Sequence, residues 1–390
     1  MRSIYRVPAH ITNLNPEAFQ PQVVSFGPYH HGKDHLLPME EHKRRARHHF
    51  IERSGKPPEH FFDSLRELDQ KWKQGSSEGT TDPFLELMIT DGCFMLEILR
   101  FIANMVNDYA FNDPIFSDHG KLYQMMYIRV DMLMLENQLP MLVLDRLVNV
   151  GNNVLKGDGI IEWLILCFCS PSKPITSLGG CRHVLDVLWE SMLMKLEKKN
   201  EVGRHYDPES FQLASATELS EHGILFKKSE TNSLNAISFA GGVLTLPSIW
   251  VDDNRKSMFL NLMAFERSPA GAGNEVMSYI YFMDHLISNG QDIALLRTQG
   301  IIVNILYSDE AAAKMFGSLA KSVIIGPNCS FIDVFEEVNK YYNKRWNMWR
   351  ANFIRTYFAN PWVTSSLIAA VFLFALTTIH TVYSVLGYYK

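Results

Sequence analysis

The 390-residue sequence lacks most of the short motifs that mark the commonest catalytic sites. It has no G-x-x-x-x-G-K-[ST], G-x-G-x-x-G or H-E-x-x-H pattern, so phosphate loops, dinucleotide sites and zinc proteases have no support. Residues 75–79, GSSEG, match G-x-S-x-G by letter, but they fall in a loop that follows a predicted helix, whereas the serine-hydrolase motif needs a strand before it and a helix after it. Cysteine is scarce as well, with five residues and no C-x-x-C pair. Such a sparse, odd set in a long chain predicts a reducing compartment without disulfides.

Positive charge is not in excess, since 37 Lys and Arg residues face 42 Asp and Glu residues and the net charge is −5. Proteins that bind nucleic acids by neutralising phosphates need a basic surface. We therefore predict no nucleic-acid partner. The first twenty residues contain no apolar run and do not predict a secretory signal peptide.

Apolar residues recur mostly at helical spacing, which predicts a mainly α protein with one large multi-helix domain over residues 1–355. In its later part we expect helices at residues 256–265, 276–288, 292–299 and 309–319. The alternating, β-branched segment near residues 223–252 predicts a small antiparallel sheet around Gly241 and Gly242. Residues 150–215, in which loop-forming runs flank two short helices, predict variable or mobile loops.

Residues 131–145 place three consecutive polar side chains inside an apolar helical pattern, DMLMLENQLPMLVLD. Glu136, Asn137 and Gln138 lie close to the interior, where an unpaired polar group costs about 2–7 kcal/mol. We expect Pro140 to bend or restart the helix because it removes a backbone donor. Two interpretations stay open: a polar network that fixes helix register, or a carboxylate that lines a pocket.

The candidate catalytic residues are four carboxylates: Asp91, Glu97, Asp131 and Glu136. They fall on two predicted helices that we expect to pack as neighbours. Paired carboxylates can divide acid and base roles when their environments separate their pKa values. The same side chains can instead cap helices or pair with Arg100 and Arg129, which is the structural alternative.

Eight of the fourteen histidines precede residue 61, and His30 and His31 are adjacent. We predict aromatic packing for this pair and neither a metal nor a cofactor, because zinc needs ligands at converging spacing. Either histidine could join the carboxylates in an enzyme. Residues 38–49, PMEEHKRRARHH, predict a charged helix with a solvated face, on which Glu41 can reach Arg45.

Residues 363–386 form an apolar run without Asp, Glu, Lys or Arg. At about 1.5 Å per residue the run matches a bilayer core of about 30 Å, so we predict a transmembrane helix. A long helix over 331–357 and a juxtamembrane segment over 356–362 should precede it, with aromatic and basic residues suited to a membrane interface. Several cations precede the span and only Lys390 follows it, which places residues 1–355 in the cytosol unless the Asn328 sequon is glycosylated.

Several ordered motifs carry a family resemblance, in addition to residues 131–145: IYRVP at 4–8, VSFGPYHHG at 24–32, DGCFMLE at 91–97, ATEL at 216–219, NLMAFE at 261–266 and YFANPW at 357–362. With them the sequence resembles, over nearly its whole length, the plant proteins that carry domain of unknown function 247 (DUF247), also called UPF0481. That family is defined by sequence and has no settled activity. Its members usually have a short extension before the first motif, so we expect the true N-terminus upstream.

The resemblance implies a membrane-anchored recognition or signalling protein that meets the bilayer through residues 363–386 and has a protein partner. Some grass members of the family look like pollen-side determinants of self-incompatibility. The alternative is a membrane-tethered enzyme that uses the four carboxylates.

Overall fold

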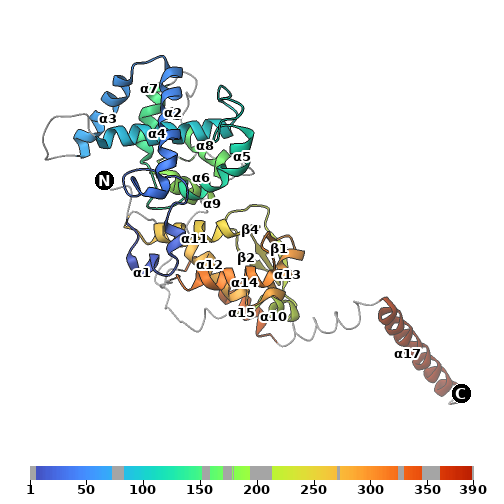
Figure 1. The fold of residues 1–390 in the computed structure, drawn as a ribbon. Helices are drawn as coiled ribbons and strands as arrows, with labels where there is room; N and C mark the ends of the chain where they lie inside the picture. The colour runs from blue at the N-terminus through green and yellow to red at the C-terminus, as the bar shows by residue number, and fades with distance from the viewer. Residues whose placement is uncertain are drawn as a thin grey trace.

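The computed structural model describes residues 6–72, 83–151, 159–169, 178, 180–193, 213–269, 273–323, 329–344 and 361–388. Within them the chain is mainly helical, as predicted, with two small sheets and one long apolar helix at the C-terminal end (Figure 1). Most of the predicted loop section at 150–215 and of the juxtamembrane segment at 356–362 lies outside these residues.

The first half of the chain begins with an arm of short turns and continues in a group of packed helices. The arm contains α1 (Ala9–Thr12) and the 3₁₀ turns η1 (Pro16–Phe19) and η2 (Asp34–Leu36). The helices are α2 (Leu37–Ser54), α3 (Pro58–Trp72), α4 (Pro83–Ile102), α5 (Asp118–Tyr123), α6 (Met125–Met132), α7 (Met141–Gly151), α8 (Ile160–Cys169) and α9 (Val184–Met192). The apolar helix α4 packs against α2, α3, α7 and α8, so it forms the centre of this half.

The second half packs helices around two small sheets. Its helices are α10 (Ala216–Glu221), α11 (Asp253–Glu266), α12 (Glu275–Leu286), α13 (Gly290–Thr298), α14 (Asp309–Ala320) and α15 (Ile332–Tyr342). The four helices predicted at 256–319 are confirmed as α11 to α14. Three of them begin at a side-chain cap, from Asp252, Asn289 and Ser308. At α13, for example, Asn289 and Asp292 form a capping box. Buried apolar residues of both halves join in one core, and α11 contacts α6 and η1 of the first half.

The predicted sheet exists, but it is mixed. Strand β3 (Val243–Leu246) pairs antiparallel with β2 (Ser238–Ala240) across the turn at Gly241 and Gly242, and parallel with β1 (Leu225–Lys228). A second sheet pairs β4 (Ile249–Val251) in parallel with β5 (Ile302–Asn304), a strand that the sequence did not indicate. Apolar alternation identifies a strand, but it does not say which distant segment will be its partner.

The stretch at 131–145 is not one bent helix. Helix α6 ends at Met132, residues 133–140 form a buried loop, and α7 begins at Met141 directly after Pro140. The expected restart at the proline is therefore confirmed, and the helical reading of Glu136, Asn137 and Gln138 is wrong. The helix expected at 331–357 also ends early, at Tyr342, and residues 345–357 lie outside the described part of the chain.

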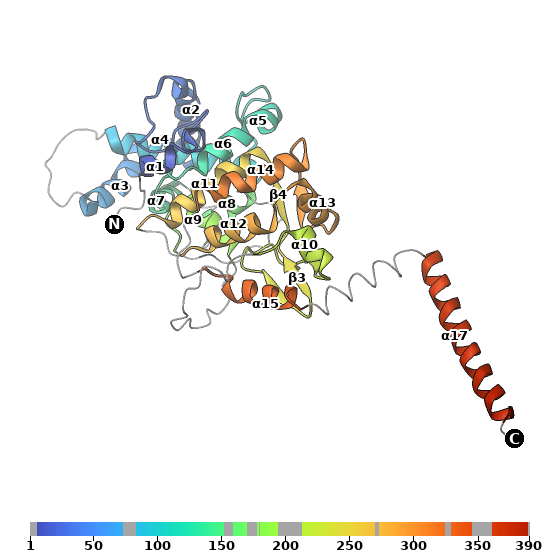
Figure 2. The same cartoon turned by 90° about the horizontal axis from the view of Figure 1, so that it is seen from below.

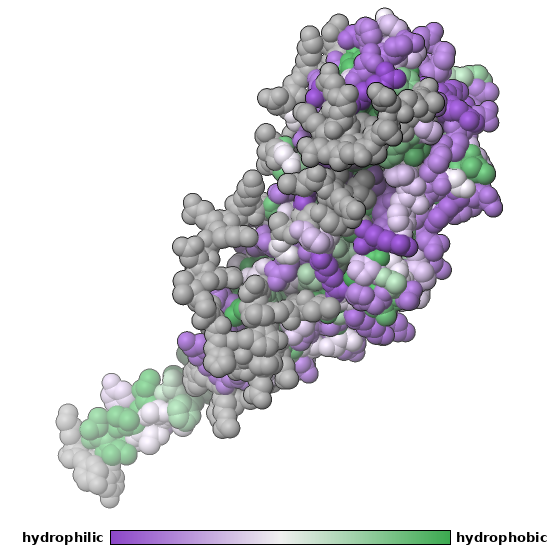
Figure 3. Space-filling model, turned by 90° about the vertical axis from the view of Figure 1, so that its left-hand side faces the viewer, coloured by the Kyte–Doolittle hydropathy of each residue, from purple (hydrophilic) through white to green (hydrophobic). Residues whose placement is uncertain are grey.

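The C-terminal helix α17 (Pro361–Tyr388) stands away from the folded body in both ribbon views (Figures 1 and 2). Within it, Thr364–Gly387 is long and apolar enough to cross a membrane, and none of that segment is buried. In Figure 3 hydrophobic residues gather along this helix, whereas hydrophilic residues predominate among the described residues on the visible face of the body.

Candidate functional site

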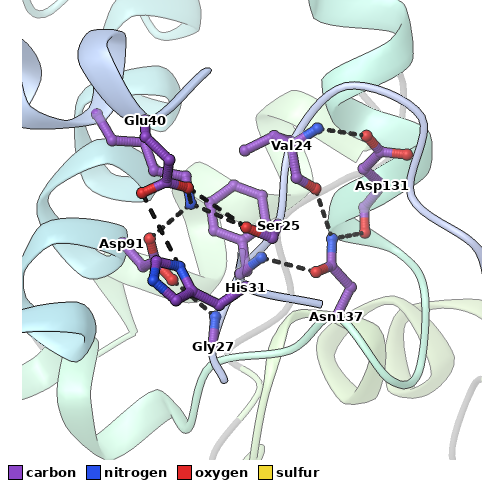
Figure 4. A network of polar contacts seen from close by, with 10 residues as sticks. Val24, Ser25, Gly27, His31, Glu40, Asp91, Asp131 and Asn137 are labelled. Carbon is purple, nitrogen blue, oxygen red and sulfur yellow. Dashed lines mark hydrogen bonds and ion pairs between the residues drawn. The ribbon is translucent and has the colours of Figure 1, made fainter. Parts of the chain in front are cut away.

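The N-terminal arm is held on the helical body by buried polar side chains. The carboxylate of Asp131, near the end of α6, accepts three backbone N–H bonds, from Gln22 at 2.8 Å, Val23 at 2.7 Å and Val24 at 2.9 Å (Figure 4). Burial raises the pKa of Asp131 to about 6, and the three amides oppose that rise because they stabilise the anion. Asp131 thus pairs three consecutive N–H groups of a bent segment that belongs to neither a helix nor a strand.

Asn137 and Gln138 complete the attachment from the loop between α6 and α7. The Asn137 side chain accepts from the Phe26 N–H at 2.7 Å and donates to the carbonyls of Val24 and Asp131 at 3.0 and 2.9 Å. Gln138 donates to two carbonyls of its own loop and accepts from the Leu185 N–H at 3.1 Å. These amides satisfy backbone groups that neither a helix nor a strand could pair.

Asp91 binds the arm from α4. One carboxylate oxygen accepts from the Gly27 N–H at 2.8 Å, and the other forms an ion pair with Lys43 at 2.8 Å in which neither side chain is exposed (Figure 4). Gly27 has a φ of +72°, and a Cβ there would lie 3.1 Å from the Gln138 carbonyl oxygen, so the close approach requires glycine. Burial raises the pKa of Asp91 to about 6, with Lys43 opposing the rise.

Lys43 corrects the prediction of a solvated charged helix at 38–49. It is fully buried, and it shares one face of α2 with Met39, Ala46 and Phe50. That spacing was visible in the sequence and placed the lysine on the apolar stripe. The expected pair of Glu41 with Arg45 is also replaced, since Arg45 forms an ion pair with Asp113 at 2.7 Å.

Glu97 lies on α4 within a separate cluster. Its two oxygens accept from the Arg53 guanidinium at 2.8 Å each, a bidentate pair, and one also accepts from the Tyr109 hydroxyl at 2.7 Å. Arg100 approaches the same carboxylate at 3.4 Å. Glu97 is therefore paired with arginine, as the structural alternative expected. Arg100, which that alternative named, is one partner, and Arg53 is the closer one.

Asn261 extends the attachment to the second half of the chain. It accepts from the Leu135 N–H at 2.9 Å and donates to the Ala18 carbonyl at 2.7 Å, which joins α11 to both the loop and the arm. At the end of the same helix, Glu266 accepts from the Trp189 indole and from two backbone N–H groups at the start of α12. Burial raises the pKa of Glu266 to about 7. Asn261 and Glu266 were not among the predicted site residues. Both lie in the NLMAFE motif, and that motif could have identified them.

Glu136 differs from the other three carboxylates because it lines a cavity. Its Oε1 accepts from the Val7 N–H at 2.7 Å, and burial raises its pKa while this bond, Arg6 and Tyr29 oppose the rise. The cavity, which is lined by residues of the arm and by Glu136, has a volume of about 600 Å³, within the usual range for small-molecule sites. Asp91, Glu97 and Asp131 have no exposed surface and do not line this cavity.

The two adjacent histidines have different surroundings. His31 is exposed and its ring lies 4.0 Å from Glu40. His30 is buried, lines the cavity and packs edge to face on Tyr29, and burial together with Lys33 and His35 lowers its pKa to about 4. Within the described ranges no three His, Cys, Asp or Glu residues converge to hold a metal ion. The cavity, with neutral His30, Glu136 and two nearby cations, is the candidate site.

Three of the motifs that carry the family resemblance meet in this attachment: the arm at 24–32, Asp91 on α4 and the loop after Asp131. A family model described as plant protein of unknown function, DUF247, matches residues 4–376. The chain is 29% identical to the UPF0481 protein At3g47200 of Arabidopsis thaliana, over 99% of this chain and 86% of that protein. It is 21% identical to a second UPF0481 protein of that plant, At3g02645, over 97% and 89% of the two chains. No solved structure matches significantly. Because the family model covers nearly the whole chain, this protein belongs to the DUF247 family of plant proteins.

Proposed function

We propose that this chain is a membrane-anchored recognition protein, in which α17 spans a bilayer and the folded body meets a protein partner. The observation that carries the proposal is the apolar segment Thr364–Gly387, which is long and apolar enough to cross a membrane and is not buried by any described part of the chain. A self-incompatibility role rests on the family resemblance alone, and we leave it out of the proposal.

The side chains of α17 suit lipid better than water. Phe372, Leu373 and Phe374 are 63%, 63% and 76% exposed, so water would surround apolar surface on all sides of the helix. The hydroxyls of Thr377, Thr378 and Thr381 donate to carbonyls four residues earlier in the helix, which leaves these donors satisfied in a bilayer. At about 1.5 Å per residue, 24 residues span about 36 Å, enough for a hydrocarbon core of about 30 Å.

The charges on the two sides of the span favour a cytosolic body. Lys344, Arg345, Arg350 and Arg355 precede the helix, and only Lys390 follows it. Cytoplasmic flanks of membrane helices are enriched in Lys and Arg. The proposal therefore places the folded body, and with it the candidate site, on the cytosolic side of the membrane.

A cluster of exposed apolar residues supports a protein partner. Four large side chains lie close together on the adjoining helices α5 and α6: Leu122, Tyr123, Met126 and Tyr127, which are 69%, 55%, 47% and 42% exposed. Single exposed apolar residues are ordinary, but grouped aromatic and methionine side chains are typical of interaction surfaces. We assign the partner contact to this α5–α6 surface.

Alkaline carbonate extraction tests the anchor and protease protection tests the orientation. The full chain should stay in the membrane pellet, and a chain ending at residue 360 should be released. In sealed microsomes an N-terminal epitope should be digested and Asn328 should carry no glycan. A truncated chain that still pellets refutes the single anchor, and a protected epitope reverses the topology.

Affinity capture of the full chain from membranes tests the α5–α6 surface. We expect Leu122→Asp together with Tyr127→Asp to remove partners that the unchanged chain retains. Leu225→Asp is the matched control, because Leu225 is 65% exposed and lies on β1, away from α5 and α6. Equal capture by both variants would move the partner contact to another surface.

A further inference from the structure

His30 is a buried side chain that the attachment of the arm leaves without a partner. It is 1% exposed, and in the described part of the chain neither ring nitrogen has a hydrogen-bond partner. A buried polar group in this state destabilises the fold, and such groups in native proteins usually mark an ion, a ligand or ordered water. Since His30 lines the cavity, a molecule bound there can supply the missing bond.

The same cavity has an excess of positive charge. Arg6 and Lys33 both line it, and neither has an anionic partner within 4.0 Å among the described residues. The Arg6 guanidinium lies 5.7 Å from the Tyr29 ring centroid, a contact that orients it at the cavity edge. Glu136, the one carboxylate in the lining, already accepts from the Val7 N–H. An incoming anion therefore meets two cations that are free to bind it.

Part of the remaining wall is apolar. Val7, Pro8, Pro16 and Phe19 supply this part, whereas Thr12, Asn13 and Gln20 add polar groups. Val7 and Phe19 belong to the hydrophobic core, which fixes the apolar part in place. Inorganic phosphate would leave such a wall in contact with water, whereas a molecule with an apolar body would cover it. Binding sites for small molecules commonly combine an apolar lining with a few placed polar groups.

We propose that this cavity binds a small organic acid. Its carboxylate lies between Arg6 and Lys33, its apolar body lies against Phe19 and the proline wall, and a polar atom of the ligand hydrogen-bonds to His30. A neutral imidazole presents one donor and one acceptor, so it serves either kind of ligand atom. This inference goes beyond the proposed anchoring and partner binding, and it holds or fails without them.

Calorimetric titration of the purified full chain tests the site. The probes are 4-phenylbutyrate and hexanoate, their neutral counterparts 4-phenylbutanol and hexanol, and inorganic phosphate. Arg6→Gln with Lys33→Gln should weaken carboxylate binding about tenfold or more, because the variant loses both charged hydrogen bonds. His30→Phe should weaken it about fivefold without loss of thermal stability, because a neutral bond is removed and an unpaired polar group leaves the interior.

Lys314→Gln is the matched charge control, because Lys314 is exposed on α14 and does not line the cavity. The proposal is supported if a carboxylate binds the wild type and the control equally, and binds the cavity variants more weakly. It is overturned if neither carboxylate binds more tightly than its alcohol, if the cavity variants bind as well as the control, or if phosphate binds as tightly as the carboxylates. Membrane extraction of the same proteins reports on α17 separately, so the two proposals can fail independently.

Discussion

The N-terminal arm and the C-terminal helix satisfy their backbones in opposite ways. Much of the arm is irregular, and its N–H groups reach Asp91, Asp131, Glu136 and Asn137, which lie 64 to 129 residues away in sequence. Helix α17 pairs its backbone within itself, and no described part of the chain buries its apolar segment. The arm therefore depends on the body for its polar groups, whereas α17 depends on its surroundings only for its apolar surface.

The largest effect should come from breaking the buried ion pair under the arm. Asp91→Ala takes one of two carboxylates from the buried Lys43 ammonium, leaving Glu40 at 2.7 Å, and removes the acceptor of Gly27, so we expect a loss of about 3–4 kcal/mol in the free energy of unfolding. Urea unfolding of the purified chain measures it. Adding Lys43→Met should restore part of the stability, and a loss below about 1 kcal/mol in the single variant would contradict a buried, paired charge.

A change at Asp131 tests how much the hydrogen bonds to the arm's backbone contribute, because its carboxylate is held by N–H groups and not by a cation. Asp131→Ala takes the acceptor from three N–H groups, and because Gln22 is exposed, water can replace some of the bonds. We expect a loss of about 3 kcal/mol in urea unfolding, with increased hydrogen exchange at residues 22–24. Asp131→Asn keeps one acceptor and should lose about half as much. Unchanged exchange at residues 22–24 would refute the attachment.

Glu136 tests the attachment of the arm at the cavity, because its carboxylate both accepts a hydrogen bond from the arm and lines the cavity. Glu136→Ala leaves the Val7 N–H unpaired and should cost about 1–3 kcal/mol, whereas Glu136→Gln keeps an acceptor oxygen and should cost less. Thermal melts of the two variants separate these outcomes. An alanine variant that melts like the wild type would remove Glu136 from the attachment and leave it as a cavity group alone.

His30 should make the stability of the arm depend on pH. Its pKa is lowered to about 4 in the folded protein from an ordinary value of 6.5, so between pH 6.5 and 4 the unfolded chain binds the proton more tightly. The folded protein therefore has its full stability with respect to His30 above pH 6.5, where the ring is neutral in both states. It loses stability as the pH falls from 6.5 to 4. His30→Asn does not titrate there.

As the pH is lowered from 7 to 4.5, the wild type should lose stability that the His30→Asn variant keeps. We therefore expect the free energy of unfolding of the variant, relative to that of the wild type, to rise by about 1 kcal/mol over this range. Unfolding in urea at several pH values gives the difference curve. His31→Asn is the control, since the His31 ring is exposed to solvent in the folded protein. If the stability difference between His30→Asn and the wild type does not change with pH, the His30 ring of the folded wild type takes up protons as readily as it does in the unfolded chain.

Removing α17 should have the smallest effect on stability. The apolar segment is not buried against the body, so a chain that ends at residue 360 should unfold within about 0.5 kcal/mol of the full chain. Matched urea curves in the same detergent measure the difference. A larger loss in the free energy of unfolding would mean that α17 packs on the body. In that case α17 would depend on the body for stability, as the N-terminal arm does.

The sequence alone was enough for those features that depend on local patterns. Helical spacing predicted α11 to α14, and Pro140 predicted the start of α7. The uninterrupted apolar run predicted α17 to within two residues at each end. In each case the signal and the structure involve the same few neighbouring residues, so no distant contact could change the result.

Tertiary structure decided how the polar residues are used. The sequence placed Asp91, Glu97, Asp131 and Glu136 together as candidates, and folding gave Asp91 a lysine, Glu97 an arginine, Asp131 three amides and Glu136 a place at a cavity. It also decided that β1 pairs in parallel with β3 and that His30 faces the cavity while His31 faces water. The physical reason is the same throughout: a buried polar group or strand edge must be satisfied, but its partner can come from any part of the chain that the fold brings within about 3 Å.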